Sequence, residues 1–336
     1  MRISGENYYI VGTDVNPYHI ELNDLDQRYV IPQCNDPNYF SVLNEIIDKW
    51  AIDYVHPQPD IEVLAIAKNR DLIKGGKTFL PSYHSIEIAQ DKFECNSLLH
   101  DSGIPVADSV KLFNKEQART AISNLLRWNS KVWLRATHGA GSKAAVPIYH
   151  ADEAHGWINI WRHRDLDFMD FMVSEYLPGQ DFAFTSIWKE GELITSIVRQ
   201  RVLYLLGFVS PSGQSSTPSV AVIVHNDKVN EIATNAILAI DPKPQGAYYV
   251  DLKENSHGIP CVTEINAGRF NATINFFAHA GINLPHLLIK LATNQEFPNV
   301  KKYDPVPKGQ YWVRQIDMGY KLVKEGNFRA ININGS

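Results

Sequence analysis

The sequence predicts a parallel α/β layer at the N-terminus, followed by a longer α+β region. Before about residue 90, short apolar runs such as 8–14 alternate with helix-length amphipathic segments such as 39–50. This alternation is typical of parallel α/β units. Beyond about residue 170, strand-length runs dominate, and the alternating side chains of 181–188 and 193–201 predict antiparallel strands with one solvent-facing side.

Composition places the chain among ordinary globular proteins. Of its 336 residues, 44% are hydrophobic and 21% are charged, and the formal net charge is −5. Such a balance does not imply a nucleic-acid-binding surface, and no apolar run reaches the roughly 20 residues of a membrane span. The three cysteines are far apart in the sequence and are interpreted as reduced thiols. A cytoplasmic protein without a signal peptide is therefore expected.

The predicted N-terminal domain covers residues 1–88. Its expected strands or extended segments are 8–14, 29–32, 53–57 and 77–81, and its expected helices are 39–50 and 61–73. Such a layer ordinarily opens with a strand and a Gly-rich turn, and neither precedes residue 8. We therefore expect a domain that lacks its first strand, through a late start of the reading frame or through loss of the element.

The second predicted domain covers residues 89–320, with subdomains at about 106–176 and 177–320 and a tail at 321–336. Helices are expected at 92–101, 115–126, 151–162 and between 227 and 240. Strands are expected at 106–110, 132–135, 145–149, 171–175, 181–188, 193–201, 220–224, 247–253 and 261–265.

A Gly-rich turn follows the strand at 132–135. The N–H groups of such a turn can hold phosphate oxygens, and Arg135 before it and Lys143 at its end add positive charge. A flexible hairpin with two solvated cations explains the same residues equally well. His138 is either a phosphate donor or an incidental loop histidine. The turn is not a P-loop, because the GxxxxGK[ST] pattern is absent.

An acidic residue ends one predicted strand and another begins the next. Between Glu175 and Asp181, the residues Tyr176-Leu177-Pro178-Gly179-Gln180 form a short linker. Its backbone could contact an adenine edge and a carboxylate could accept from ribose hydroxyls, but a plain β-turn also explains Pro and Gly here.

Three oxygen-bearing side chains lie on two late strands. Asp251 is within an apolar strand, and Glu264 and Asn266 are two apart on the next, so they share a face. If the two strands form a hairpin, the three side chains converge, and Mg²⁺ prefers such oxygen ligands. Pairing of Glu264 with Arg269 or with another cation is the alternative interpretation.

Three arginines are candidates for binding anionic groups. Arg269 follows the strand of Glu264, at the place where a transferring phosphoryl group would lie, and a guanidinium pairs bidentately with phosphate or carboxylate. Arg199 and Arg201 alternate on one strand and so share a face. They either hold a substrate carboxylate or belong to a solvated strand face.

Taken in order, these segments resemble the ATP-grasp superfamily, and within it the branch similar to the carbamoyl-phosphate synthetase large subunit and amino-acid ligases. Asp91-Lys92 with the Gly-Ile-Pro of 103–105, the strand of Arg135, the turn at 137–143, the linker at 175–181 and Thr263-Glu264-Ile265-Asn266 carry the likeness. The expected fold is thus an ATP-grasp fold preceded by a truncated Rossmann-like pre-ATP-grasp domain. One departure concerns the family's Pro-Arg after the asparagine: here Ala267-Gly268 follow, and Arg269 comes one step later, which leaves the substrate open.

The resemblance implies a role for each matching residue. Lys92 and Arg135 would contact ATP phosphates, and Asp251, Glu264 and Asn266 would hold the metal. The remaining nucleotide contacts would come from His138, Gly139, Gly141, Ser142, Lys143, Glu175, Tyr176, Leu177 and Asp181, the last as ribose ligand.

The implied activity is an ATP- and Mg²⁺-dependent carboxylate–amine ligase that acts through an acyl phosphate, with Mn²⁺ as an alternative cation. Small carboxylate and amine substrates are expected, without nucleic-acid or membrane partners, and a homodimer is compatible. The alternatives are carbamate or carboxylate phosphorylation without ligation, and a non-catalytic ATP-binding protein. A nicotinamide-dependent oxidoreductase with Asp14 as its ribose acid is disfavoured, because no GxGxxG precedes that strand.

Overall fold

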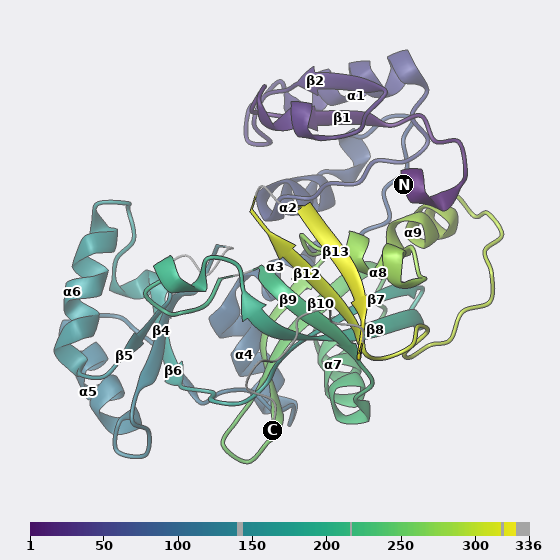
Figure 1. The fold of residues 1–336 in the computed structure, drawn as a ribbon. Helices are drawn as coiled ribbons and strands as arrows, with labels where there is room; N and C mark the ends of the chain where they lie inside the picture. Colours follow the sequence, from purple (N-terminus) through teal and green to yellow (C-terminus); the bar gives the residue numbers. More distant parts are fainter. Residues whose placement is uncertain (140–143, 216, 317–318, 327–336) are drawn as a thin grey trace.

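The structure is a computed structural model that describes residues 1–139, 144–215, 217–316 and 319–326. The described residues form three sheets, of two, four and seven strands, arranged along the chain as Figure 1 shows. Within these ranges, no helix is both long and apolar enough to cross a membrane.

The N-terminal region contains the two-stranded parallel sheet and two helices. These elements are β1 (Val11–Asp14), β2 (Gln27–Val30), α1 (Tyr39–Trp50) and α2 (Asp60–Lys68). The predicted bounds of α1 are confirmed, because its apolar residues recur at helical spacing and are buried against α2.

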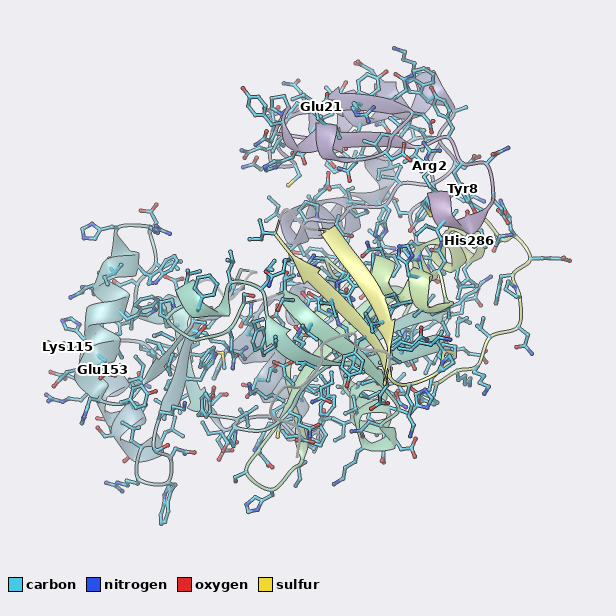
Figure 2. The ribbon with its side chains drawn as sticks, viewed as in Figure 1. Arg2, Tyr8, Glu21, Lys115, Glu153 and His286 are labelled. Carbon is cyan, nitrogen blue, oxygen red and sulfur yellow. The ribbon has the colours of Figure 1, made fainter. Side chains whose placement is uncertain are left out.

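Two predicted segments of this region do not form full strands. Segments 53–57 and 77–81 meet only in one parallel bridge, between Tyr54 and Lys77. Pro57 and Pro59 follow Tyr54 closely, and proline has no N–H for a ladder. The predicted strand at 8–14 begins only at Val11, because Tyr8 lies against the C-terminal part, where its hydroxyl is 2.8 Å from His286 Nδ1 (Figure 2).

Two consecutive helices connect the N-terminal region to the rest. α3 (Tyr83–Gln90) was not predicted, whereas α4 (Lys92–Asp101) has the predicted bounds. Asp91 caps α4, because its carboxylate accepts hydrogen bonds from the backbone N–H groups of Phe93 and Glu94. The domain boundary expected at residue 88 falls inside α3.

The four-stranded sheet has the order β3-β6-β4-β5. Its elements are β3 (Ser109–Lys111), α5 (Lys115–Leu125), β4 (Val132–Ala136), β5 (Val146–Ile148), α6 (Ala151–Arg162) and β6 (Phe171–Glu175). Val132 and Leu134 of β4 are fully buried with the apolar faces of α5 and α6. Because side chains alternate along a strand, Trp133 and Arg135 face away from the helices.

The seven-stranded antiparallel sheet has the order β11-β10-β7-β8-β9-β12-β13. Its strands are β7 (Asp181–Lys189), β8 (Glu192–Tyr204), β9 (Pro218–Val224), β10 (Gly246–Glu254), β11 (Pro260–Ala267), β12 (Gln310–Gln315) and β13 (Gly319–Lys324). α7 (Asp227–Ile240), with the predicted bounds, packs with α3 and α4 on one face, and α8 (Asn275–Ala280) and α9 (Leu284–Ala292) cover the other.

The prediction that one side of β7 and β8 faces solvent is wrong. Helices cover both faces of the sheet, so Thr185, Ser186, Thr195 and Ser196 are all fully buried. The hydroxyls of Thr195 and Ser196 donate to the carbonyl oxygens of residues 301 and 302, at 2.7 and 2.9 Å. The polar residues of these strands therefore do not mark a solvent-facing side. Those of β8 are buried and hydrogen-bond to the segment at residues 301–302.

The predictions did not include the C-terminal elements α8, α9, β12 and β13. β12 pairs with β9 and β13, and the latter runs to Lys324. The boundary expected at residue 320 consequently falls inside a strand of the large sheet.

Candidate active site

A cavity of about 430 Å³ is lined by residues of both the four-stranded and the seven-stranded sheet, a volume within the usual range of small-molecule sites, roughly 300–1,000 Å³. Most of the predicted site residues line it: Lys92, Arg135, Gly139, Glu175, Tyr176, Leu177, Asp181, Arg199, Arg201, Asp251, Glu264 and Arg269. His138 and Asn266 do not, and Gly141, Ser142 and Lys143 lie outside the described residues.

The two candidate metal carboxylates are cross-strand partners. Asp251 on β10 lies opposite Glu264 on β11, and Asn266 lies opposite Tyr249, so both carboxylates are on one face of the predicted hairpin. Among the described residues, no three His, Cys, Asp or Glu side chains gather closely enough to hold a metal by themselves. Magnesium is usually bound by one or two carboxylates, with substrate phosphates and water completing its coordination shell, so two carboxylates fit it here.

Asn266 is buried at the end of this arrangement. Its Oδ1 accepts a hydrogen bond from Arg269 Nη2, and its Nδ2 has no partner among the described residues. An amide oxygen has two lone pairs, so Oδ1 keeps one for a cation. The asparagine therefore fits the donor set, although it does not line the cavity.

Arg201 joins two of the cavity's acids. Its Nη1 lies 2.7 Å from Asp181 Oδ1, and its Nη2 lies 2.6 Å from Asp251 Oδ1. Burial raises the pKa of the Asp251 carboxyl, against the opposing effect of Arg201. Burial lowers the pKa of the Arg201 guanidinium, but the charges of the two acids outweigh it and raise that pKa overall. Both terminal nitrogens of Arg201 are therefore paired with carboxylates of the protein.

Arg199 is a buried cation of a different kind. It is 1% exposed and its Nη1 donates to Thr273 Oγ1. No carboxylate in the described part of the chain lies within ion-pair distance of it. Burial, followed by the neighbouring Arg201, lowers the pKa of Arg199 to about 9. The solvated-face interpretation is thus wrong for both arginines, and Arg199 remains available to an anionic ligand.

Lys92 and Arg135 lie beside Glu264 at the other end of the cavity. Lys92 Nζ donates to the Gly139 carbonyl at 2.6 Å and lies 3.8 Å from Glu264 Oε1. Arg135 Nη2 donates to the Thr263 carbonyl at 3.0 Å, and its Nε is buried without a partner among the described residues. Burial lowers the pKa of Arg135, and Glu264 opposes this. Both cations retain donors for phosphate oxygens.

His138 lies to the side of this cluster. Its Nδ1 is 3.1 Å from Thr137 Oγ1, its Nε2 is 3.7 Å from Asp91 Oδ2, and its side chain is 64% exposed. This placement favours an incidental loop histidine over a phosphate donor.

The linker from Glu175 to Asp181 connects the two sheets. Glu175 is fixed by its backbone N–H, which donates to the Asp108 carbonyl at 2.9 Å, and burial raises the pKa of its carboxyl. Gly179 packs against Glu254 so closely that a Cβ would lie 2.5 Å from the glutamate Cβ, which explains the glycine. Asp181 Oδ2 accepts from the hydroxyl of Tyr204, so both of its oxygens already have a partner.

Some lining residues were not predicted. Trp133 is on the cavity face of β4, its ring centroid 6.3 Å from that of Tyr176. Its position two before Arg135 was a usable signal, because such residues share a strand face. Tyr204, the last residue of β8, also lines the cavity, as do Gln214, Ser215 and Thr217 between β8 and β9.

Comparison with known proteins is consistent with this geometry. The family described as "ATP-grasp in the biosynthetic pathway with Ter operon" matches residues 167–317. No curated protein matches the sequence.

Solved structures extend the similarity over most of the chain. The biotin carboxylase domain of Hydrogenobacter thermophilus 2-oxoglutarate carboxylase, a dimer with MgADP and bicarbonate, has a TM-score of 0.66 at 14% identity, covering 90% of this chain and 67% of that one. The L-amino acid ligase of Bacillus licheniformis has 0.61 at 13%, covering 86% and 68%. N5-carboxyaminoimidazole synthetase of Staphylococcus aureus with ADP has 0.62 at 15%, covering 86% and 70%. Residues 167–317 thus match an ATP-grasp family model, and the fold of most of the chain is similar to that of these solved structures.

Proposed function

We propose that the protein is an ATP- and Mg²⁺-dependent ligase that joins a carboxylate to an amine through an acyl phosphate. The observation that carries the proposal is the convergence of Asp251 and Glu264 with Lys92, Arg135 and Arg269 on one cavity. These residues come from elements far apart in the sequence, and opposite charges are arranged there as a metal–triphosphate complex requires.

The nucleotide would lie with its base at the linker after β6. Tyr176 and Leu177 supply apolar surface there, and Asp181 would accept from the ribose through the lone pairs that Arg201 and Tyr204 leave free. Lys92 and Arg135 would bind phosphate oxygens, together with backbone groups near Gly139.

The metal would be held by Asp251 and Glu264, with Asn266 Oδ1 as a further donor. Magnesium bound there supplies charge neutralisation on the phosphate oxygens during transfer. Asp251 stays paired with Arg201 through Oδ1, which leaves its second oxygen to a cation.

The substrate carboxylate would bind at Arg199, the buried guanidinium without a carboxylate partner among the described residues. A carboxylate oxygen attacks the γ-phosphorus, the bond from that phosphorus to the β–γ bridging oxygen breaks, and ADP leaves. The amine nitrogen then attacks the carbonyl carbon, phosphate leaves and the nitrogen loses a proton. Arg135 and Arg269 would stabilise the negative charge on the transferring group.

The test is ADP release from Mg-ATP in the presence of pools of amino acids and small carboxylic acids. We expect release that requires a carboxylate, and hydroxylamine in place of the amine should trap the acyl phosphate as a hydroxamate. Release that requires a carboxylate but no nucleophile would instead establish phosphorylation without ligation. Nucleotide binding without any release would establish a non-catalytic protein. Light scattering tests the homodimer, which is the state of the biotin carboxylase domain of Hydrogenobacter thermophilus.

A further inference from the structure

The N-terminal region reaches the candidate active site through one ion pair. Asp60, the first residue of α2, accepts hydrogen bonds from two nitrogens of Arg269: Nε donates to Oδ1, and Nη2 donates to Oδ2 at 3.1 Å. The pair is bidentate, the geometry that fixes the plane of a guanidinium. Arg269 lines the cavity, whereas Asp60 does not.

The remaining contacts of Arg269 leave one of its nitrogens for a ligand. Nη2 also donates to Asn266 Oδ1, and the guanidinium carbon lies 5.3 Å from the centre of the Tyr249 ring. Within the described ranges, Nη1 has no hydrogen-bond partner. Asp60 and Asn266 thus bind Nε and Nη2 of the guanidinium, and Nη1 is the nitrogen available to a ligand in the cavity.

The contact is part of an interface between the start of α2 and the residues on either side of Arg269. Gln58 Nε2 donates to the Phe270 carbonyl at 2.6 Å, and Gln90 Nε2 donates to the Asp60 carbonyl at 2.8 Å. Gly268 has a φ of +87°, and a Cβ there would lie 2.8 Å from Val63 Cγ1. Backbone on both sides of the ion pair is therefore held in place.

We propose that Asp60 is a positioning residue, which holds Arg269 so that Nη1 meets the γ-phosphate end of the bound nucleotide; this rests on the proposed function. Without the carboxylate, the long side chain regains rotamer freedom, and a displacement of about 1 Å is enough to cost on the order of 100-fold in rate. Asp60 acts only through Arg269, so its loss should not matter where Arg269 is already absent.

The experiment compares the binding of ADP and of the β,γ-imido analogue of ATP, both with Mg²⁺, by calorimetry. The variants are Asp60→Asn, Asp60→Glu, Arg269→Met and the double variant Asp60→Asn/Arg269→Met. Asp71→Asn is the matched control, an exposed acid of the same region. We expect Asp60→Asn to weaken the analogue at least five-fold while ADP changes less than two-fold, and to add nothing to Arg269→Met. Asp71→Asn should behave as the wild type.

Three other outcomes separate the possibilities. If the wild type binds neither nucleotide, the proposed function fails and the positioning role fails with it. If the wild type binds both and Asp60→Asn weakens both equally, or only lowers the melting temperature, Asp60 is a structural contact and the inference is overturned. Independent, multiplicative effects in the double variant also overturn it. If Asp60→Asn does not fold, Asp60→Glu, which keeps the charge, supplies the same comparison.

Discussion

Asp251 and Glu264 lie directly opposite each other on β10 and β11, so two carboxylates share one wall of the cavity. Like charges this close oppose each other's ionisation. Glu264 accordingly adds to the raised pKa of Asp251, whose first cause is burial. Lys92 and Arg201 offset part of this repulsion from either side, and a divalent cation would offset more.

Glu264→Ala should slow ADP release by at least about 100-fold, because it removes one of the two carboxylates proposed to hold the metal. The side chain is 25% exposed, so the circular dichroism spectrum should not change. The exposed Glu296→Gln is the control. Undiminished turnover in Glu264→Ala would refute the metal assignment.

Magnesium-dependent nucleotide binding should raise thermal stability. Mg-ADP at about 100 times its dissociation constant should stabilise the fold by about 2.7 kcal/mol, seen as a higher melting temperature. Chelation with EDTA should reduce the shift, because the diphosphate then faces two uncompensated carboxylates. An equal rise in melting temperature with and without magnesium would contradict the proposed metal site.

Arg201→Met should destabilise the protein by about 3–5 kcal/mol, because it leaves two carboxylates unpaired in a buried position. Urea unfolding measures the change. The control is Arg119→Met, which breaks an ion pair with Asp152 whose side chains are 65% and 77% exposed, so that the expected loss is at most about 1 kcal/mol. Losses of similar size in both variants would show that Arg201 is not a buried bridge.

His56 should make stability depend on pH. Its ring lies between Tyr54 and Phe270, with centroid distances of 6.1 and 5.4 Å, and burial lowers its pKa from 6.5 to about 4. Because the folded-state pKa is the lower one, the unfolded chain binds the proton first. The contribution of His56 to the free energy of unfolding is therefore fully present above about pH 6.5 and is lost as the pH falls toward about 4.

The expected loss assigned to His56 is about 2–3 kcal/mol between pH 7 and pH 4.5. His56→Phe keeps an aromatic ring in place and removes the titrating group, so its unfolding free energy should fall less over the same interval. Identical pH dependence in the two proteins would exclude this role for His56.

Much of the fold followed from local pattern, and the predicted ATP-grasp fold is confirmed. α1 and α6 begin and end at the predicted residues, because amphipathic spacing is a property of consecutive residues. α9 was missed although Asn283 caps it and Leu284-Pro285 open it, so its signal was present in the sequence.

The contacts between the site residues could not be predicted from the local sequence pattern. The pairing of Arg201 with both Asp181 and Asp251 depends on β7 lying between β8 and β10, and strand order is not encoded locally. Asp60 and Arg269 are 209 positions apart, and only the tertiary fold brings them together. The roles of the individual site residues remain predictions.

Because one guanidinium is shared by Asp181 and Asp251, the proposed ribose site and the proposed metal site are electrostatically coupled. A redesign of Asp181 to accept another nucleoside would release a donor of Arg201 and change the charge felt at Asp251. If the proposed roles hold, a change of nucleotide preference at Asp181 should therefore also change the requirement for a divalent ion, unless both acids are redesigned together.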